Sequence, residues 1–290
     1  MRNAGPIETP FDRALRRQRR DRAADADGYP RFLLHRASDE VLERLDLVAR
    51  SFSRALDLGC GDLYLTERLR ARGMIVDPVD PGPIFAARAA GIQADEDSRP
   101  WGDACYDLVV SVGVLDTVND LPGALSLVRR ALRPDGLFLA AFAGAGSLPR
   151  LRTALRAAEE AEGRPASPRL HPQIDVRAAG DLLTRAGFAL PVADSEGLDV
   201  RYSSLARLVA DLRGMAGTNV LKARDRRPFG RTGLAAATAA FAAQAGADGK
   251  TTERIEILHL SGWAPAPNQP QPAQRGSATA SLAEALKSKG

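Results

Sequence analysis

Residues 54–62 read RALDLGCGD and place an acid and two closely spaced glycines directly after a short apolar run. Glycine lets a backbone approach a ligand closely and adopt positive φ, so Gly59 and Gly61 predict a turn that holds a ligand against bare main chain. A G-x-G-x-x-G phosphate fingerprint needs a third glycine, which GCGDLY lacks. Asp62 follows the turn, and an acid there suits a cationic ligand better than a pyrophosphate.

The turn resembles the first motif of the class I S-adenosylmethionine (SAM) methyltransferases. That resemblance implies that Asp57 faces the methionine amino group, whose positive charge a carboxylate offsets. It also implies a ribose contact at Asp80, which ends the apolar run MIVDPVD, because one carboxylate can accept hydrogen bonds from two hydroxyls. Residues 93–97, QADED, follow the next run, and there Asp95 or Glu96 could accept from the adenine amino group.

The segment LVVSVGVL has the form of the fourth strand of this superfamily, with Ser111 and Val112 beside the cofactor. A lone glycine turn is a weak signal, whereas the turn, two acidic positions and this strand at their observed spacing form a specific set. The implied cofactor is SAM, and no metal site is predicted. Its predicted contacts are Asp57, Gly59, Cys60, Gly61, Asp80, Pro81, Asp95, Glu96, Ser111 and Val112.

Strand and helix patterns alternate between residues 54 and 144. Short apolar runs predict buried strands, and the segments between them, with apolar residues three or four positions apart, predict helices. Such alternation predicts a mostly parallel sheet with helices on both faces. The expected class is α/β, a Rossmann-like class I methyltransferase fold, which the resemblance completes to a seven-stranded sheet with added helices.

The sequence divides into three parts by composition. Residues 1–52 predict a basic, helical N-terminal arm. Residues 53–264 predict the SAM-binding domain, with helical additions at 146–187 and 203–246. Residues 265–290 are rich in proline and glutamine and predict a flexible tail.

The net charge of +4, from 40 basic and 36 acidic residues, is concentrated in the arm. Residues 12–22, DRALRRQRRDR, carry six arginines and two aspartates. This segment could meet an acidic protein, anionic lipid or nucleic acid, or it could be a solvated helix face. It lacks the interleaved aromatic residues of a single-strand nucleic-acid surface, so nucleic acid is not expected. Ser38 is predicted to be the N-cap of the arm's second helix.

Cysteine content and hydropathy exclude two other classes. Two cysteines are too few for a disulfide framework and indicate a reducing compartment. No apolar run reaches the length of about 18 residues that a spanning helix needs. The first residues lack the apolar region of a secretory signal.

Several segments outside the turn resemble a single family, the methyltransferase-like assembly factors of respiratory complex I in mitochondria and related bacteria. They are FDRALRRQRRDRAA, ADEDSRPWGDACYDLVVS, VNDLPGAL, DLRGMAGTN and QRGSATASLAEAL, and the resemblance covers about residues 11–286. It implies an enzyme that modifies a protein, a peripheral-arm subunit of complex I. The chain starts only ten residues before FDR, which favours a bacterial cytoplasmic protein. Peripheral association with the inner membrane face is a separate expectation for its partner.

The resemblance leaves the reaction open. It implies hydroxylation of an arginine in that subunit for mitochondrial members, and methyl transfer for bacterial members. A SAM-ordered assembly chaperone without catalysis is a third reading. A fourth is the malonyl-carrier-protein O-methyltransferase, which resembles the chain mainly over residues 54–144. The three histidines do not form the His-x-Asp/Glu triad of iron(II) oxygenases, so a hydroxylation mechanism is not readable here.

Catalytic residues remain unassigned. The candidate pocket residues are Tyr29, Asp116, His171 and Tyr202. The family tends to read Leu-His-Trp where this chain has Leu115, Asp116 and Thr117, so any chemistry of that histidine is in doubt here. The basic segment and the C-terminal tail are expected to serve the partner rather than the cofactor, because residues 54–144 already supply every expected SAM contact.

Overall fold

The computed structural model describes residues 9–26, 30–267 and 269, and a seven-stranded sheet lies at its centre. The strand order is β3-β2-β1-β4-β5-β7-β6, in which β1 to β5 are parallel and β7 runs antiparallel to both of its neighbours. The strands are β1 (Arg54–Leu58), β2 (Ile75–Asp80), β3 (Ile92–Gln93), β4 (Tyr106–Val112), β5 (Leu132–Ala143), β6 (Ala189–Tyr202) and β7 (Thr251–Trp263). The sequence prediction of a mostly parallel α/β sheet is confirmed.

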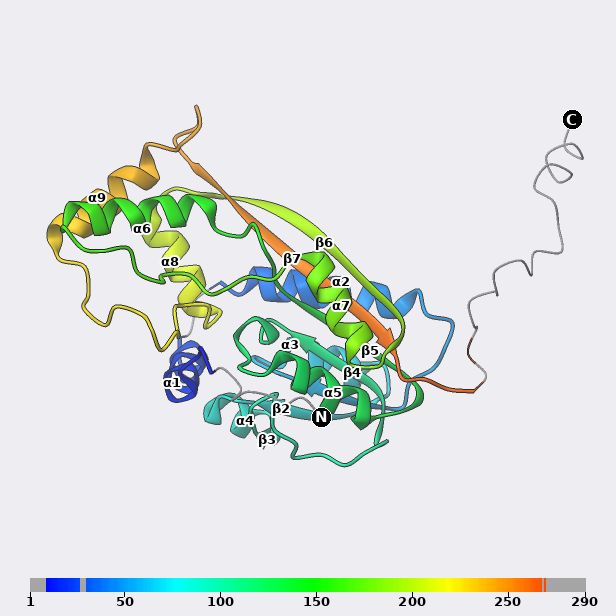
Figure 1. The fold of residues 1–290 in the computed structure, drawn as a ribbon. Coiled ribbons are helices and arrows are strands. Elements are labelled where there is room, and N and C mark those ends of the chain that lie inside the picture. Colours follow the sequence, from blue (N-terminus) through cyan, green and yellow to red (C-terminus); the bar gives the residue numbers. More distant parts are fainter. Residues whose placement is uncertain (1–8, 27–29, 268, 270–290) are drawn as a thin grey trace, which may run out of the picture.

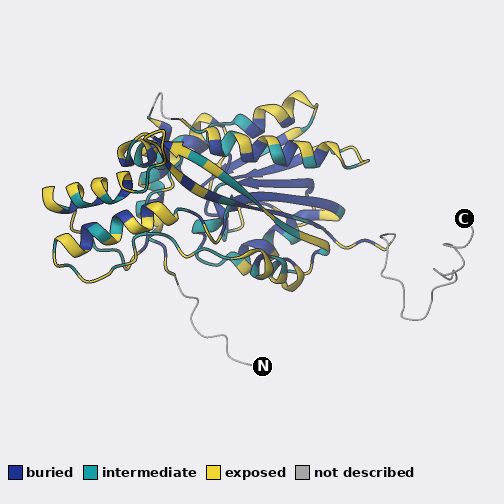
Figure 2. Cartoon of the chain, turned by 90° about the horizontal axis from the view of Figure 1, so that it is seen from above, coloured by how far each residue is buried: buried dark blue, intermediate teal, exposed yellow. Residues whose placement is uncertain are grey.

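Helices cover both faces of the sheet, and Figure 2 shows the buried strands between them. Two helices, α5 and α7, pack with the core cluster on one face, and α2 and α3 pack with the cluster on the other. The helices are α1 (Arg13–Ala24), α2 (Phe32–Asp46), α3 (Tyr64–Ala71), α4 (Pro83–Arg88), α5 (Leu121–Ala131), α6 (Pro149–Ala161), α7 (Val176–Arg185), α8 (Leu205–Gly214) and α9 (Arg231–Ala242).

Three helices form a separate layer beyond the sheet. Helices α6, α8 and α9 pack around a third apolar cluster, and Figure 1 shows them beside the extended ends of β6 and β7. They fall within the two predicted additions, and the pairing of α6 with α9 joins segments far apart in the chain. This layer therefore stands over one end of the sheet.

The apolar runs form strands because their side chains are buried on both faces. Every residue of β4 is buried, and so are the last four of the five residues of β1. In the parallel register Leu56 lies opposite Val109, and Asp57 lies opposite Val110. The two strands therefore end side by side, which brings the residues that follow them together.

The N-cap prediction at Ser38 is wrong. Helix α2 begins six residues earlier, at Phe32, without a side-chain cap. Ser38 is buried inside the helix, where its hydroxyl donates to the carbonyl of Leu34 at 2.8 Å. The hydroxyl thus has a hydrogen-bond acceptor in the preceding turn of the helix, which is how serine is accommodated within a helix.

Across the described ranges, no helix is both long and apolar enough to cross a membrane. The predicted tail at 265–290 lies, from residue 270 onward, outside the described residues, as does Tyr29.

Candidate functional site

The glycine turn follows β1 directly and takes the backbone conformation that glycine allows. Gly59 has φ +92° and Gly61 has φ +52°. The amides of Gly59 and Cys60 both donate to the carbonyl of Val79 in β2, at 2.7 and 3.1 Å. A Cβ on Gly59 would lie 2.5 Å from the Val114 side chain, so no larger residue fits without displacement. The turn thus presents bare backbone at the carboxyl edge of the sheet.

Asp80 ties this turn to the next one. It ends β2, is fully buried, and accepts from the amide of Gly61 at 3.0 Å and from that of Gly82 at 2.7 Å. The predicted ribose acceptor is therefore at the predicted place, beside the glycine turn. Pro81 follows it, buried, with its carbonyl accepting from Gln93 at 3.2 Å.

Arginine side chains of α1 form ion pairs with the acidic residues that were predicted to bind the cofactor. Arg20 binds Asp80 through Nε at 2.7 Å and through Nη2 at 2.5 Å. Arg16 binds Glu96 with both Nη atoms, at 2.7 and 2.8 Å. Both guanidinium groups are buried, Arg16 at 5% and Arg20 at 7% exposure.

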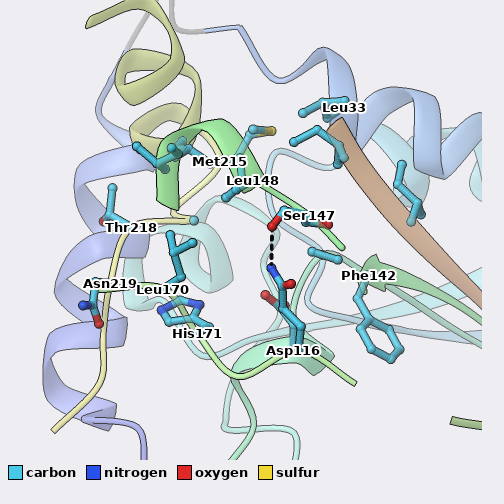
Figure 3. A pocket seen from close by; sticks show the side chains of 18 of the residues that line it. Leu33, Asp116, Phe142, Ser147, Leu148, Leu170, His171, Met215, Thr218 and Asn219 are labelled. Atoms are coloured by element: carbon cyan, nitrogen blue, oxygen red, sulfur yellow. Dashed lines mark hydrogen bonds between the residues drawn. The ribbon is translucent and has the colours of Figure 1, made fainter. Parts of the chain in front are cut away.

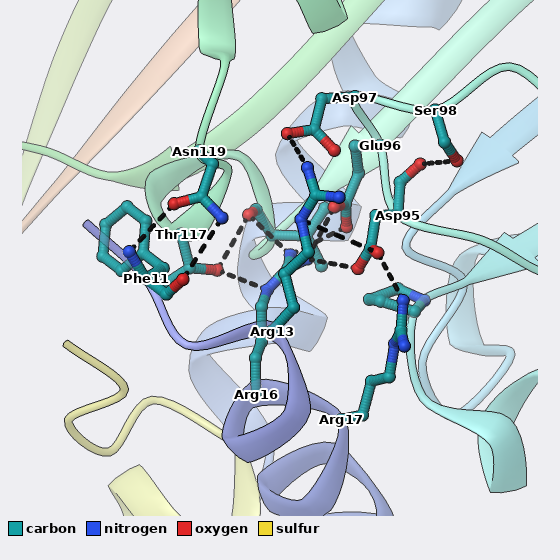
Figure 4. A network of polar contacts seen from close by, with 12 residues as sticks. Phe11, Arg13, Arg16, Arg17, Asp95, Glu96, Asp97, Ser98, Thr117 and Asn119 are labelled. Carbon is teal, nitrogen blue, oxygen red and sulfur yellow. Dashed lines mark hydrogen bonds and ion pairs between the residues drawn. The ribbon is translucent and has the colours of Figure 1, made fainter. Parts of the chain in front are cut away.

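Figure 4 shows Arg13, Arg16 and Arg17 reaching from α1 toward the three acids at 95–97. Arg17 pairs with Asp95 at 2.5 Å, and Arg13 pairs with Asp97 at 2.7 Å. The reading of the basic segment as a solvated face or a free partner surface is therefore wrong for the buried arginines. Sequence reasoning missed them as site residues, although the spacing of Arg16 and Arg20 places both on one face of a helix.

With α1 in this position, little room is left at the turn. The cavity there has a volume of about 40 Å³, far below the roughly 300–1,000 Å³ typical of ligand pockets. Arg20 and Phe85 share its wall with Asp57 and the glycines. Asp80 accepts four hydrogen bonds, two from backbone amides and two from Arg20, which leaves it no free acceptor.

Asp57 lies under the turn with 1% exposure. Burial raises the pKa of its carboxyl to about 7, a hydrogen bond from the Thr66 hydroxyl at 2.5 Å opposes that rise, and the charge of Asp80 adds to it. Burial also raises the pKa of the Cys60 thiol, which keeps that group neutral. Near neutral pH the ionisation of the Asp57 carboxyl therefore depends on the charge of the group that binds beside it.

Of the two β4 residues that were predicted to lie beside the cofactor, only one lines the cavity at the turn. Val112 lines the cavity at the turn. Ser111 is fully buried and its hydroxyl donates to the carbonyl of Leu58 at 2.8 Å, so it joins two strands and does not line that cavity.

A second, larger cavity of about 260 Å³ adjoins the first. The two share Leu34, Val112, Gly113 and Met215 as a common wall. Its other walls are mainly apolar side chains of α2, α6 and α8 and of the loop before α7, several of which Figure 3 shows. Sequence reasoning did not find this cavity, because segments far apart in the chain build it.

Two of the four pocket candidates line the larger cavity, Asp116 and His171. Tyr202 does not: it packs in the apolar cluster of α6, α8 and α9. His171 accepts a hydrogen bond from the amide of Val220 at its Nε2 atom, at 3.0 Å, and burial lowers the pKa of its imidazole. The ring is therefore neutral near pH 7, with its proton on Nδ1.

Within the part of the chain that the structure describes, no group of three or more His, Cys, Asp or Glu side chains is placed to hold a metal ion.

Comparison with known proteins places these features among methyltransferase-domain proteins. Residues 56–140 match the family model described as a methyltransferase domain. The chain is 33% identical over 289 residues to a Danio rerio protein named arginine-hydroxylase NDUFAF5, mitochondrial, covering 96% of this chain and 89% of that one. It is 30% identical over 268 residues to the malonyl-[acyl-carrier protein] O-methyltransferase of Xylella fastidiosa, covering 88% of this chain and 89% of the relative.

A solved structure shares the fold. The YcgJ protein of Bacillus subtilis superposes with a TM-score of 0.54 at 13% identity, covering 80% of this chain and 99% of that one. Such similarity describes the architecture, and the reaction has to be argued from the site.

Proposed function

Since the chain belongs to the family of the mitochondrial arginine-hydroxylase NDUFAF5, we propose that it is a SAM-dependent enzyme of methyltransferase fold that modifies a protein side chain. The observation that carries the proposal is the junction of the glycine turn with Asp80. Bare backbone at positive φ lines the cavity at the carboxyl edge of the sheet, and the buried carboxylate of Asp80, at the end of the neighbouring strand, accepts from the amide of Gly61 behind Arg20.

The side chains at this edge fit the chemical parts of SAM. The main chain at Gly59 and Gly61 lines the cavity without a side chain of its own, and beside Gly61 only Arg20 and the carbonyl of Gly59 lie within 4 Å. Asp80 would accept from the ribose hydroxyls, and Asp95 or Glu96 from the adenine amino group. Asp57 would face the ammonium group. When bound, SAM supplies a methyl group that is already activated on its sulfonium.

Helix α1 has to move for this to happen. Arg20 holds both oxygens of Asp80, and Arg16 holds both oxygens of Glu96. We infer that the structure is a closed form, in which the guanidinium groups take the place of the ligand's donors. Withdrawal of α1 exposes these acids, and the hydroxyl and amino groups of the ligand then donate hydrogen bonds to them.

The partner we propose is a peripheral-arm subunit of complex I, at the cytoplasmic face of the inner membrane in a bacterium. The support is the resemblance of segments spread over residues 11–286, which extends well beyond the SAM-binding core. The named relatives cover nearly the whole chain, which agrees with a shared role beyond cofactor binding.

Arginine hydroxylation is the second candidate, because relatives that are 33–34% identical carry that name. The mass of the partner separates the two reactions. Incubation of the purified partner subunit with this protein and SAM should add about 14 mass units for methyl transfer, and with dioxygen and an electron donor also present it should add about 16 for hydroxylation. An unchanged mass in both mixtures, with SAM bound, would contradict both reactions and favour a chaperone without catalysis.

A further inference from the structure

The larger cavity lies where an acceptor would meet the bound cofactor. Its wall continues into the cavity at the glycine turn through Val112 and Gly113, at the end of β4. Val114, the next residue, lies against Gly59. A side chain entering the 260 Å³ cavity would therefore reach the turn past this shared wall.

Three ionisable side chains line this cavity, and two of them have partners within the protein. His171 is neutral and accepts from the amide of Val220. Arg169 is 15% exposed and binds Glu159 at 2.8 Å. Both groups are therefore engaged within the protein.

The third side chain, Asp116, is different. Among the described residues it has no hydrogen-bond or ion-pair partner, although it is only partly exposed. The neighbouring cation, Arg16, uses both Nη atoms on Glu96 and its Nε on Thr117. Asp116 thus lies on the wall of a mostly apolar cavity without a hydrogen bond or a close ion pair among the described residues, although Arg16 and His171 lie near enough to feel its charge.

We propose that Asp116 selects the acceptor, a side chain with an apolar stem and a cationic end, and holds that end while the apolar walls hold the stem. The inference rests on the proposed function for the position of the cofactor. A charge-assisted hydrogen bond between a guanidinium and a carboxylate in such a site is about twice as strong as one between neutral groups.

The same charge disfavours an acidic acceptor. A malonyl-type carboxylate would enter beside Asp116 and be repelled by it, and Arg169, the cation that lines the cavity, is already paired with Glu159.

Three small probes test the inference by calorimetry in the presence of SAM: N-acetylarginine amide, its neutral isostere N-acetylcitrulline amide, and N-acetylglutamate amide. The wild type should bind the arginine probe at least about tenfold more tightly than either of the others. Asp116→Asn should abolish that preference and Asp116→Glu should keep part of it. Asp181→Asn, which changes an exposed aspartate of α7, should leave it unchanged.

Affinity for SAM is measured in the same variants, so that the two proposals can fail separately. Preference for the arginine probe without SAM binding would uphold Asp116 and overturn the proposed cofactor. Equal binding of the three probes, tighter binding of the glutamate probe, no binding of the arginine probe, or a preference unchanged in Asp116→Asn would each overturn the role of Asp116.

Discussion

A single residue, Asp57, is expected to make the affinity for SAM depend on pH. Its pKa is raised to about 7, mainly by burial, so the carboxyl is largely protonated at pH 6 and largely ionised at pH 7.5. A cationic amino group favours the ionised form, whereas the ligand's own α-amino group loses its proton only near pH 8. SAM affinity should therefore rise about fivefold between pH 6 and pH 7.5. Calorimetry at the two pH values checks this, and Asp57→Asn should weaken binding and flatten its pH dependence. A wild-type affinity that falls over this interval would contradict the assignment.

Asp80 affects stability more than its sequence position indicates. An acid at a sheet edge is expected to tolerate removal, but here it anchors two turns and neutralises a buried guanidinium. Asp80→Asn should lower the free energy of unfolding by about 3 kcal/mol, because Arg20 is left buried without its counter-ion.

Adding Arg20→Met to Asp80→Asn should restore much of that loss, since the unpaired charge is then removed as well. Urea denaturation of the two single variants and the double variant measures the coupling. Additive losses would show that the two side chains do not depend on each other.

At the scale of elements, α1 controls access to the cofactor acids. If closure by Arg20 competes with SAM, Arg20→Gln should raise the population of the open form and tighten SAM binding, by about threefold or more. Arg22→Gln removes an exposed arginine of the same helix and should change nothing. Weaker binding in Arg20→Gln would mean that the arginine assists the cofactor.

Hydrogen exchange tests the same helix without substitution. Amides of α1 should exchange faster when SAM is added to the wild type, because opening breaks the contacts of Arg16 and Arg20. Slower exchange would indicate that α1 stays closed over the ligand.

Elements differ in how far the sequence predicts them. Strands β1 and β4 follow from apolar runs whose residues are buried on both faces, and that local pattern is enough, whereas both residues of the short β3 are exposed. The turn and Asp80 follow from spacing, because parallel strands end at one edge. The start of α2 does not follow from the sequence, because no side chain caps that end of the helix.

The position of α1 and the larger cavity could not be predicted for a different reason. The spacing of Arg16 and Arg20 defines a helix face but not the surface that this face meets. That surface comes from the ends of β2 and β3, more than fifty residues away. The cavity likewise needs α2, α6 and α8 in place together.

A buried histidine in the central sheet is expected to make the stability of the whole molecule depend on pH. His259 lies in β7 with 1% exposure, neither ring nitrogen has a partner among the described residues, and burial lowers its pKa below 6.5. Below about pH 6.5 the histidine binds a proton in the unfolded chain more readily than in the folded chain. The free energy of unfolding therefore falls as the pH drops below about 6.5. Between pH 7.5 and 5.5, the melting temperature of His259→Leu should fall less than that of the wild type. Equal falls would show that His259 does not contribute.

Binding of SAM at the glycine turn is the central claim, and calorimetry of three proteins tests it most directly. Gly59→Ala places a Cβ against Val114, whereas Gly249→Ala introduces the same positive-φ strain where no atom lies within 4 Å. The wild type and Gly249→Ala should bind SAM equally, and Gly59→Ala should lose binding by at least about tenfold, with NADH giving no heat in any of them. Unchanged binding in Gly59→Ala, or binding of NADH in place of SAM, would contradict the account.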